Sequence, residues 1–259
     1  MKGEKVRGEM ELSYSKLSLL LRCARAFDFR YIQKLRTPLQ SFLYLGGSCH
    51  FALAENFRFK INAKKDMSLE KLLDCFSDAW GNGSYFEDEE PGEVDWQGED
   101  PGYVKDVGVE ILRSYHRELA PKVEPLAVEL LLERSVNDVL LRGRVDLIRG
   151  EGVPLDFKTA RRKKSQDELD RDLQPTVYTL LLGGPSPFEF HFLLKTKVPA
   201  VLLSQTHRTQ KDIDWFTREL LPKAAAQISA GIFPPNPTGF LCSPDYCVFY
   251  DVCGRPRQF

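Results

Sequence analysis

The chain has 259 residues, with 36 lysines and arginines against 37 aspartates and glutamates and a formal net charge of −1. This balance argues against a uniformly basic surface, and 42% hydrophobic with 28% charged residues is typical of an ordinary globular protein. No apolar run approaches the roughly 20 residues of a membrane span, and the N-terminus lacks the apolar core of a signal peptide. We therefore expect a cytoplasmic protein without membrane contact, and we expect no disulfides among its six cysteines.

The charges are unevenly distributed along the chain. Residues 87–100 carry eight acidic and no basic side chains, whereas basic residues gather around Arg22 and Arg25 and in the run 161–164. Basic patches of this kind favour contact with a polyanion, and a solvated charged surface is the alternative interpretation.

Hydrophobic periodicity predicts helices in the first half of the chain and strands in the second. The expected helices are 15–34, 42–62, 68–80 and 103–119, and the acidic, Pro- and Gly-rich stretch 81–102 is expected to be a loop or insertion. The pattern then predicts strands at 126–136, 139–148 and 153–159, with Asn137-Asp138 as a hairpin turn. A helix at 167–182, strands at 188–196 and 200–208 and a closing helix at 211–230 follow. This order predicts an α/β fold with one central mixed sheet flanked by helices.

The stretch 152–160, GVPLDFKTA, places two opposite charges on one side of a predicted strand. Side chains alternate along a strand, so Asp156 and Lys158 share a face, and a bend after Gly143 would aim Asp146 at the same point. Two converging carboxylates repel each other unless one is protonated or a cation lies between them, and Mg²⁺ or Mn²⁺ suits oxygen ligands. Lys158 would then orient a metal-bound water or stabilise charge on a phosphate, as phosphodiester hydrolysis requires. The alternative is a surface ion pair on an edge strand.

Further polar residues that could face this strand lie on the predicted helices before and after it. Gln174 and Tyr178 lie four residues apart on the next predicted helix, so both can face the sheet, and His50 lies on an early helix. Together these residues resemble the motifs of the PD-(D/E)XK nuclease superfamily, in particular its RecB-like branch of helicase–nuclease domains and CRISPR-associated adaptation nucleases. The order in that family is a helix-borne histidine, G-x-x-D, D-x-K and Q-x-x-x-Y. In this chain the corresponding residues are His50, Gly143 with Asp146, Asp156 with Lys158, and Gln174 with Tyr178.

The resemblance implies a restriction-endonuclease-like core over 42–230, within a single nuclease domain spanning 1–259. It implies that an Mg²⁺ or Mn²⁺ ion is held by His50, Asp146, Asp156 and the backbone carbonyl of Phe157. Lys158 would be catalytic with the two carboxylates, and Gln174 and Tyr178 would position the scissile strand or the lysine. The implied activity is that of a DNA exonuclease on single strands in recombination, repair, phage replication or CRISPR adaptation. The implied partners are DNA and a helicase or another recombination or adaptation protein.

Three cysteines near the C-terminus, Cys242, Cys247 and Cys253, have the spacing C-x₄-C-x₅-C, and Cys23 lies on the first predicted helix. From the residues alone, these thiols could bind zinc, bind an iron–sulfur cluster, or remain reduced and buried. The resemblance implies a [4Fe-4S] cluster that joins the N-terminal helix, 13–36, to the tail, 233–259. The first tail interval is two residues longer than the C-x₂-C usual in that family, so the chain departs from the pattern at Cys242. Two further cysteines, Cys49 and Cys75, are expected in the core.

A substrate strand is expected to pass the metal along the basic segments. Tyr14, Arg22 and Arg25 near the cluster, and Arg161 and Arg162 after the catalytic strand, offer the cations and rings that single strands bind. One alternative function is a catalytically silent DNA-binding or scaffold protein with a nuclease-like fold, although the intact lysine of the D-x-K motif argues against it. Another is a small-molecule phosphohydrolase, but no Gly-rich phosphate loop supports a nucleotide-binding enzyme.

Overall fold

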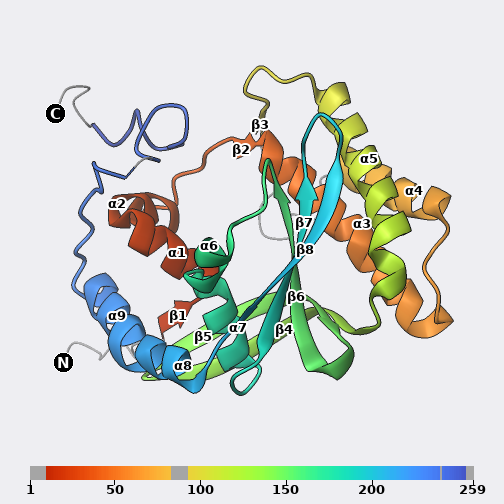
Figure 1. The fold of residues 1–259 in the computed structure, drawn as a ribbon. Coiled ribbons are helices and arrows are strands. Elements are labelled where there is room, and N and C mark those ends of the chain that lie inside the picture. Colours follow the sequence, from red (N-terminus) through yellow and green to blue (C-terminus); the bar gives the residue numbers. More distant parts are fainter. Residues whose placement is uncertain (1–9, 83–92, 240, 255–259) are drawn as a thin grey trace, which may run out of the picture.

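The computed structural model describes residues 10–82, 93–239 and 241–254, and within them six strands form one main sheet with helices on both sides (Figure 1). The strand order is β1-β5-β6-β7-β8, and β4 pairs with β5. The strands are β1 (Met10–Leu12), β4 (Pro125–Val136), β5 (Val139–Arg149), β6 (Val153–Ala160), β7 (Pro187–Leu194) and β8 (Ala200–His207). The β1–β5 and β6–β7 pairs are parallel and the others antiparallel, so the predicted mixed sheet is confirmed.

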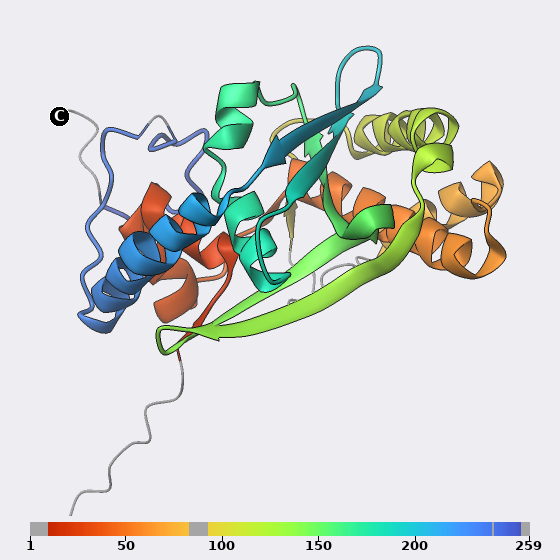
Figure 2. The same ribbon diagram turned by 60° about the horizontal axis from the view of Figure 1, so that its bottom comes forward.

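Each side of the sheet has its own hydrophobic core, which explains the two groups of helices seen in Figure 2. One core contains Phe57, Phe76 and Phe157 and lies under α3, α4 and α5. The other contains Phe188 and Phe190 and is covered by α1, α2, α7, α8 and α9. The helices are α1 (Tyr14–Arg22), α2 (Ala24–Phe27), α3 (Ser41–Ala63), α4 (Leu69–Asn82), α5 (Pro101–Glu118), α6 (Gln166–Asp170), α7 (Leu173–Leu181), α8 (Gln210–Trp215) and α9 (Leu221–Ser229).

Three predicted helices are interrupted, because local polar groups and backbone angles outweigh the hydrophobic pattern. Cys23 has extended backbone angles that end α1 and begin α2, and a π-helical turn, Asp28–Ile32, follows. The predicted helix 167–182 divides into α6 and α7, because the Asp172 carboxylate accepts the Gln174 N–H at 2.9 Å and caps a new helix. The closing helix 211–230 contains a second π-helical turn, Phe216–Leu220.

The turn between β4 and β5 agrees with the sequence-based prediction. Asn137 and Asp138 both have positive φ angles, 50° and 61°, and the pairing of Val136 with Val139 closes the hairpin. Two consecutive left-handed residues give the strands the twist that a two-residue hairpin needs.

Part of the acidic stretch 81–102 is anchored to the fold, and 83–92 lies outside the described residues. β3 (Val94–Asp95) pairs with β2 (Leu39–Gln40), and Trp96 packs 5.7 Å from the rings of both Tyr44 and Trp80. Asp100 accepts the Tyr103 N–H at 2.7 Å and caps α5. The end of this stretch therefore connects α3, α4 and α5, a set of contacts that the prediction of a loop or insertion did not include.

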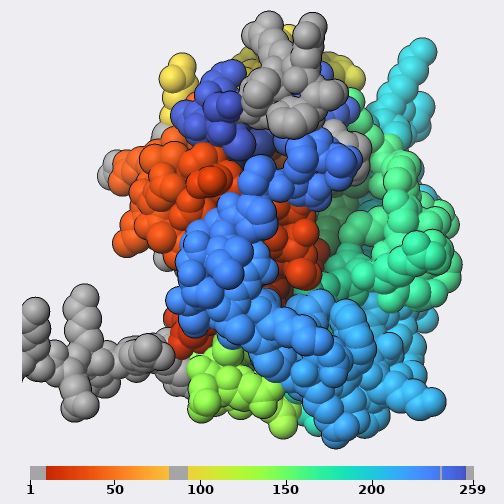
Figure 3. Space-filling model, turned by 90° about the vertical axis from the view of Figure 1, so that its left-hand side faces the viewer, coloured from red at the N-terminus to blue at the C-terminus, as the bar shows by residue number. Residues whose placement is uncertain are grey.

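The C-terminal residues lie against the N-terminal helices, as Figure 3 shows in blue over red and orange. Asn236 Nδ2 donates to Arg22 O at 3.0 Å, and Arg25 N–H donates to Pro234 O at 3.2 Å. Deeper in this contact, the ring of Phe249 packs 5.6 Å from that of Phe29. The two ends of the chain therefore form one structural unit beside the sheet.

Candidate functional site

The site lies where β5 and β6 separate. Their antiparallel pairing runs from Arg149–Val153 to Leu147–Leu155, and beyond it β6 pairs with β7 on its other side. At this fork, Asp146 Oδ2 accepts the Phe157 N–H at 2.8 Å, so a carboxylate replaces the strand carbonyl that would otherwise accept it. The fork thus brings Asp146 against the backbone of the D-x-K strand.

Asp156 is buried and contacted by two other residues named by the motifs. Gln174 Nε2, from the first turn of α7, donates to Asp156 Oδ1, and Lys158 Nζ lies 2.7 Å from Asp156 Oδ2. The ammonium of Lys158 is the charged partner of that oxygen, and the two groups form an ion pair. Asp156 and Lys158 share a strand face, as period-two alternation predicts.

Tyr178 fixes the position of β5 next to Asp146. Its hydroxyl donates to Arg144 O at 2.9 Å, on the side of β5 that β6 has left. Its ring occupies the space in front of Gly143, where an added Cβ would stand 2.8 Å from Tyr178 Cε1. The glycine of the G-x-x-D motif is therefore needed for close approach of α7, and no bend of the strand has to be invoked.

His50 projects from α3 toward the same point. Its Nδ1 lies 3.3 Å from Asp146 Oδ2, and its ring meets that of Phe157 edge-on at 5.6 Å. Burial lowers the pKa of His50 to about 4, and the opposing effect of the nearby Asp156 is smaller. The imidazole is therefore neutral near pH 7, the form that can ligate a metal.

Ionisation of both carboxylates at once is unfavourable, because they are buried and close to each other. Burial, and then the charge of Asp156, hold the pKa of Asp146 well above its ordinary value. Burial lowers the pKa of Lys158, but the Asp156 carboxylate more than compensates, so the net shift is upward and the lysine stays charged. One of two such carboxylates keeps a proton unless a cation binds between them and takes the place of that proton.

The chemistry of these groups suits a hard divalent cation. Two carboxylates and the Phe157 carbonyl are the donor types that Mg²⁺ or Mn²⁺ accepts, and the neutral imidazole suits Mn²⁺ better than Mg²⁺. Two buried acceptor atoms in the site, Asp156 Oδ2 and Gln174 Oε1, have no hydrogen-bond donor among the described residues. As the side chains stand, no three His, Cys, Asp or Glu residues within 10–82, 93–239 and 241–254 could together hold a metal ion. An ion held at this point would have to draw these side chains closer together.

Three of the four cysteines in the terminal segments, Cys23, Cys247 and Cys253, pack against the same hydrophobic core. Burial raises the pKa of the Cys247 thiol, and a hydrogen bond with the Phe249 backbone opposes this shift. Within the described residues no three of the cysteines are arranged to hold a metal ion, so the structure does not support the expected cluster. Outside this group, Cys49 is fully buried and Cys75 packs against the core under α3–α5.

The predicted DNA-binding arginines fall in two places. Arg22 and Arg25 lie at the junction of α1 and α2, and Arg25 is 3.6 Å from Asp28. Arg161 and Arg162 directly follow β6 at the surface, and Arg162 forms a two-pronged ion pair with Glu168 at 2.7 and 2.8 Å. Arg161 is thus nearest in sequence to the D-x-K strand, while Arg162 is already engaged by a carboxylate.

Arg208 supports the site indirectly and gave no sequence signal. Its side chain is 2% exposed, and its five N–H groups make five hydrogen bonds between the end of β8, the end of α6 and the start of α7. It thereby anchors the helix that carries Gln174 and Tyr178. The acceptors are hydroxyls or carbonyls of Thr176, Thr206, His207, Leu169 and Asp172.

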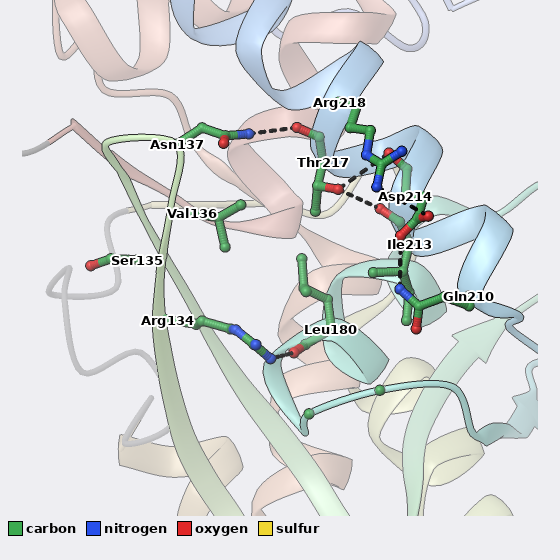
Figure 4. Close-up of a pocket in the computed structure, with 12 residues that line it drawn as sticks. Arg134, Ser135, Val136, Asn137, Leu180, Gln210, Ile213, Asp214, Thr217 and Arg218 are labelled. Carbon is green, nitrogen blue, oxygen red and sulfur yellow. Dashed lines mark hydrogen bonds and ion pairs between the residues drawn. The ribbon is translucent and has the colours of Figure 1, made fainter.

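Two cavities adjoin α7. The first, of about 480 Å³, lies at its C-terminal end between the β4–β5 hairpin and α8 (Figure 4). Its polar groups mainly engage one another: Arg134 donates to Leu180 O, and Asn137 donates to Thr217 O. The second, of about 450 Å³, lies at the opposite end of α7 and is lined by Tyr14 and Asp172 among others. Of these two cavities, the second is lined by Leu173, the residue before Gln174.

Comparison with known proteins gives a family and a fold. The model of the PD-(D/E)XK nuclease superfamily matches residues 11–254. A candidate exonuclease from Eubacterium rectale superposes with a TM-score of 0.58 at 12% identity, covering 99% of this chain and 96% of that one, which indicates a shared fold. The structure of SSO0001 gives a TM-score of 0.37 at 13% identity, covering 92% of this chain and 96% of that one, which is too low to indicate a shared fold. No curated protein sequence matches the chain.

None of the described helices is long and apolar enough to span a bilayer. The family match extends from β1 to the cysteine-bearing tail and includes every strand of the fork. The chain belongs to the PD-(D/E)XK nuclease superfamily.

Proposed function

We propose that the chain is a metal-dependent DNA nuclease of the RecB-like branch, acting as an exonuclease on single-stranded DNA. The observation that carries this proposal is the convergence of His50, Asp146, Asp156, Lys158 and Gln174 on one buried point at the β5–β6 fork. Recombination, repair, phage replication or CRISPR adaptation, with a helicase or a related partner, are the settings that the resemblance suggests.

His50, Asp146, Asp156 and the Phe157 carbonyl would hold the Mg²⁺ or Mn²⁺ ion. When bound, the ion would supply an activated water and charge neutralisation at the scissile phosphate. Lys158 keeps its proton beside Asp156 and would stabilise negative charge developing on the phosphate. Gln174 orients the Asp156 carboxylate through its amide, and Tyr178 holds β5 in place through Arg144.

Digestion of end-labelled single-stranded DNA with Mn²⁺ tests the assignment. Wild type should release mononucleotides or short products from linear DNA and leave circular single strands intact. Asp156→Ala should lose this activity, whereas Asp78→Ala, at an exposed acid on α4, should keep it. Equal cleavage by Asp156→Ala and wild type would remove the site assignment, and cutting of circles would replace exonuclease with endonuclease action. Binding of DNA without cleavage under any metal would favour the silent scaffold.

A [4Fe-4S] cluster held by Cys23, Cys242, Cys247 and Cys253 is part of the proposal, with zinc as the alternative occupant. The packing of Cys23, Cys247 and Cys253 against one hydrophobic core, and the contacts between the tail and the N-terminal helices, support it. Such a centre would fasten both ends of a single nuclease domain whose core spans 42–230.

Anaerobic purification followed by absorption spectroscopy and metal analysis tests the cluster. A broad band near ~400 nm with iron and sulfide is expected, and Cys247→Ser should abolish it while Cys75→Ser should not. Stoichiometric zinc without iron would replace the cluster with a zinc site, and absence of both metals would remove the proposal.

A further inference from the structure

A groove of about 450 Å³ opens between α1 and the α6–α7 segment, at the end of α7 that carries Gln174. Its α1 wall is formed by Tyr14, Ser18 and Leu21, and its opposite wall ends at Asp172 and Leu173. The residues of α1 and α7 are in contact, as Figure 1 also indicates. Asp172 accepts the backbone N–H of the next residue but one, Gln174, whose side chain donates to Asp156. Two hydrogen bonds, joined through Gln174, therefore connect Asp172 in the groove wall to Asp156.

The charged side chains of the groove neutralise one another. Lys164 pairs with Asp172, and Arg171 pairs with Asp167 at 2.9 Å. The remaining acid, Glu168, is held by an arginine outside the groove. No cation among the described lining residues is left without an acid partner, so the groove is poorly suited to a phosphate.

The remaining lining surface is aromatic and apolar with a few polar atoms at its edge. It consists of the Tyr14 ring, the Ser18 hydroxyl, Leu21, whose side chain is half exposed, and Leu173. Flat aromatic platforms of this kind bind nucleobases of single strands by stacking, with little sequence preference. A duplex stem would not fit, because its bases are already stacked on each other.

Tyr14 is held in place at the start of its helix and lies close to the reacting groups. Ser13 accepts the Lys16 N–H at 3.3 Å and caps α1, which fixes the first turn. Burial and then the charge of Asp172 raise the pKa of Tyr14 to about 12, while the nearby Lys158 acts in the opposite direction. The phenol is therefore protonated at working pH and within electrostatic range of Lys158.

We infer that this groove is a base-binding subsite in which Tyr14 stacks on the nucleobase next to the scissile phosphate. The ligand class is a single unpaired nucleobase within a DNA strand, and the inference rests on the proposed nuclease function. The subsite would hold the strand so that a phosphate next to the bound base reaches Asp156.

Binding of fluorescein-labelled single-stranded DNA to the cleavage-silenced Asp156→Ala protein tests the subsite. Adding Tyr14→Ala should weaken binding about 5- to 150-fold, the range expected for loss of one stacked base. Tyr14→Phe should bind as the parent protein does, and so should Tyr103→Ala, at an exposed tyrosine on α5. Circular dichroism checks that each variant is folded, and Leu21→Asp, at an exposed wall position, should weaken binding without touching the core.

Abasic DNA, which lacks one base, distinguishes the loss of a stacking contact from a general loss of protein structure. An oligonucleotide series with one abasic site moved along the strand should show a single position at which binding to the parent protein falls. At that position Tyr14→Ala should cause no further loss. Equal affinity of Tyr14→Ala and parent, or the same loss on intact and abasic DNA, would overturn the subsite while leaving the nuclease proposal intact. Failure of the wild type to bind any single strand would overturn the proposed function, and the subsite with it.

Discussion

Gly143 faces the ring of Tyr178, so adding one methyl group at this position tests how closely α7 packs against β5. A Cβ at this position would stand 2.8 Å from Tyr178 Cε1 and 3.0 Å from Leu181 Cδ1. Carbon atoms pack best at about 3.5–4.0 Å. Both neighbours are buried on the same helix, so relief of the clash requires α7 to move.

Gly143→Ala should therefore destabilise the protein by about 2–4 kcal/mol. Over-packing of a core usually costs about 1–3 kcal/mol. A displaced Tyr178 would also lose its hydrogen bond to Arg144 O, which contributes about 0.5–1.5 kcal/mol net. With a urea m value of about 2 kcal/mol per molar, the midpoint should fall by about 1–2 M.

Urea unfolding followed by circular dichroism measures this effect. Gly184→Ala is the matched control, because nothing lies within 4 Å of a Cβ added there. In a Tyr178→Ala background the cost of Gly143→Ala should shrink, since the closest clashing atom is gone. An unchanged midpoint for Gly143→Ala, or an equal cost with and without the Tyr178 ring, would refute the packing argument.

Burial and the charge of Asp156 raise the pKa of Asp146, so this acid keeps its proton to a higher pH in the folded than in the unfolded protein. Metal-free protein should therefore lose stability as the pH rises above about 4 toward that raised pKa, and urea titrations of Asp146→Asn should show a smaller loss. Gly108→Ala should lower the unfolding free energy by about 1–3 kcal/mol, because a Cβ there would stand 2.4 Å from Phe76 Cζ, and a wild-type denaturation midpoint would contradict this. Arg208→Met should lower the melting temperature in calorimetry by several degrees, because five acceptors, three of them in buried hydrogen bonds, lose their donor; an unchanged transition would mean that water replaces it.

Local patterns predicted the parts of the fold that depend on short-range geometry. Period-two alternation along β6 predicted a shared face for Asp156 and Lys158, and their side chains form an ion pair. The Asn-Asp turn was predicted from residues that tolerate positive φ angles, and both have them. The functional roles of these side chains remain predictions.

Features that depend on distant residues were not predictable. The sequence does not reveal that β6 separates from β5 after Leu155 and pairs with β7. This fork nevertheless lets the Asp146 carboxylate accept the Phe157 N–H. The division between α6 and α7 depends partly on Arg208, which is 36 residues from Asp172, whose carbonyl it binds. Hydrophobic periodicity continues through that break, so it predicted one helix.

The junction of the two chain ends has a consequence for biosynthesis. Arg22 and Asn236 touch although they are 214 residues apart, so the N-terminal helices are made long before the segment that covers them. At about 5–20 residues per second this delay is roughly 10–40 s. During that interval Phe29, which is buried in the finished protein against Phe249, has no cover from its final neighbour. Nascent or truncated chains that lack the last segment should therefore be the forms that most need chaperones.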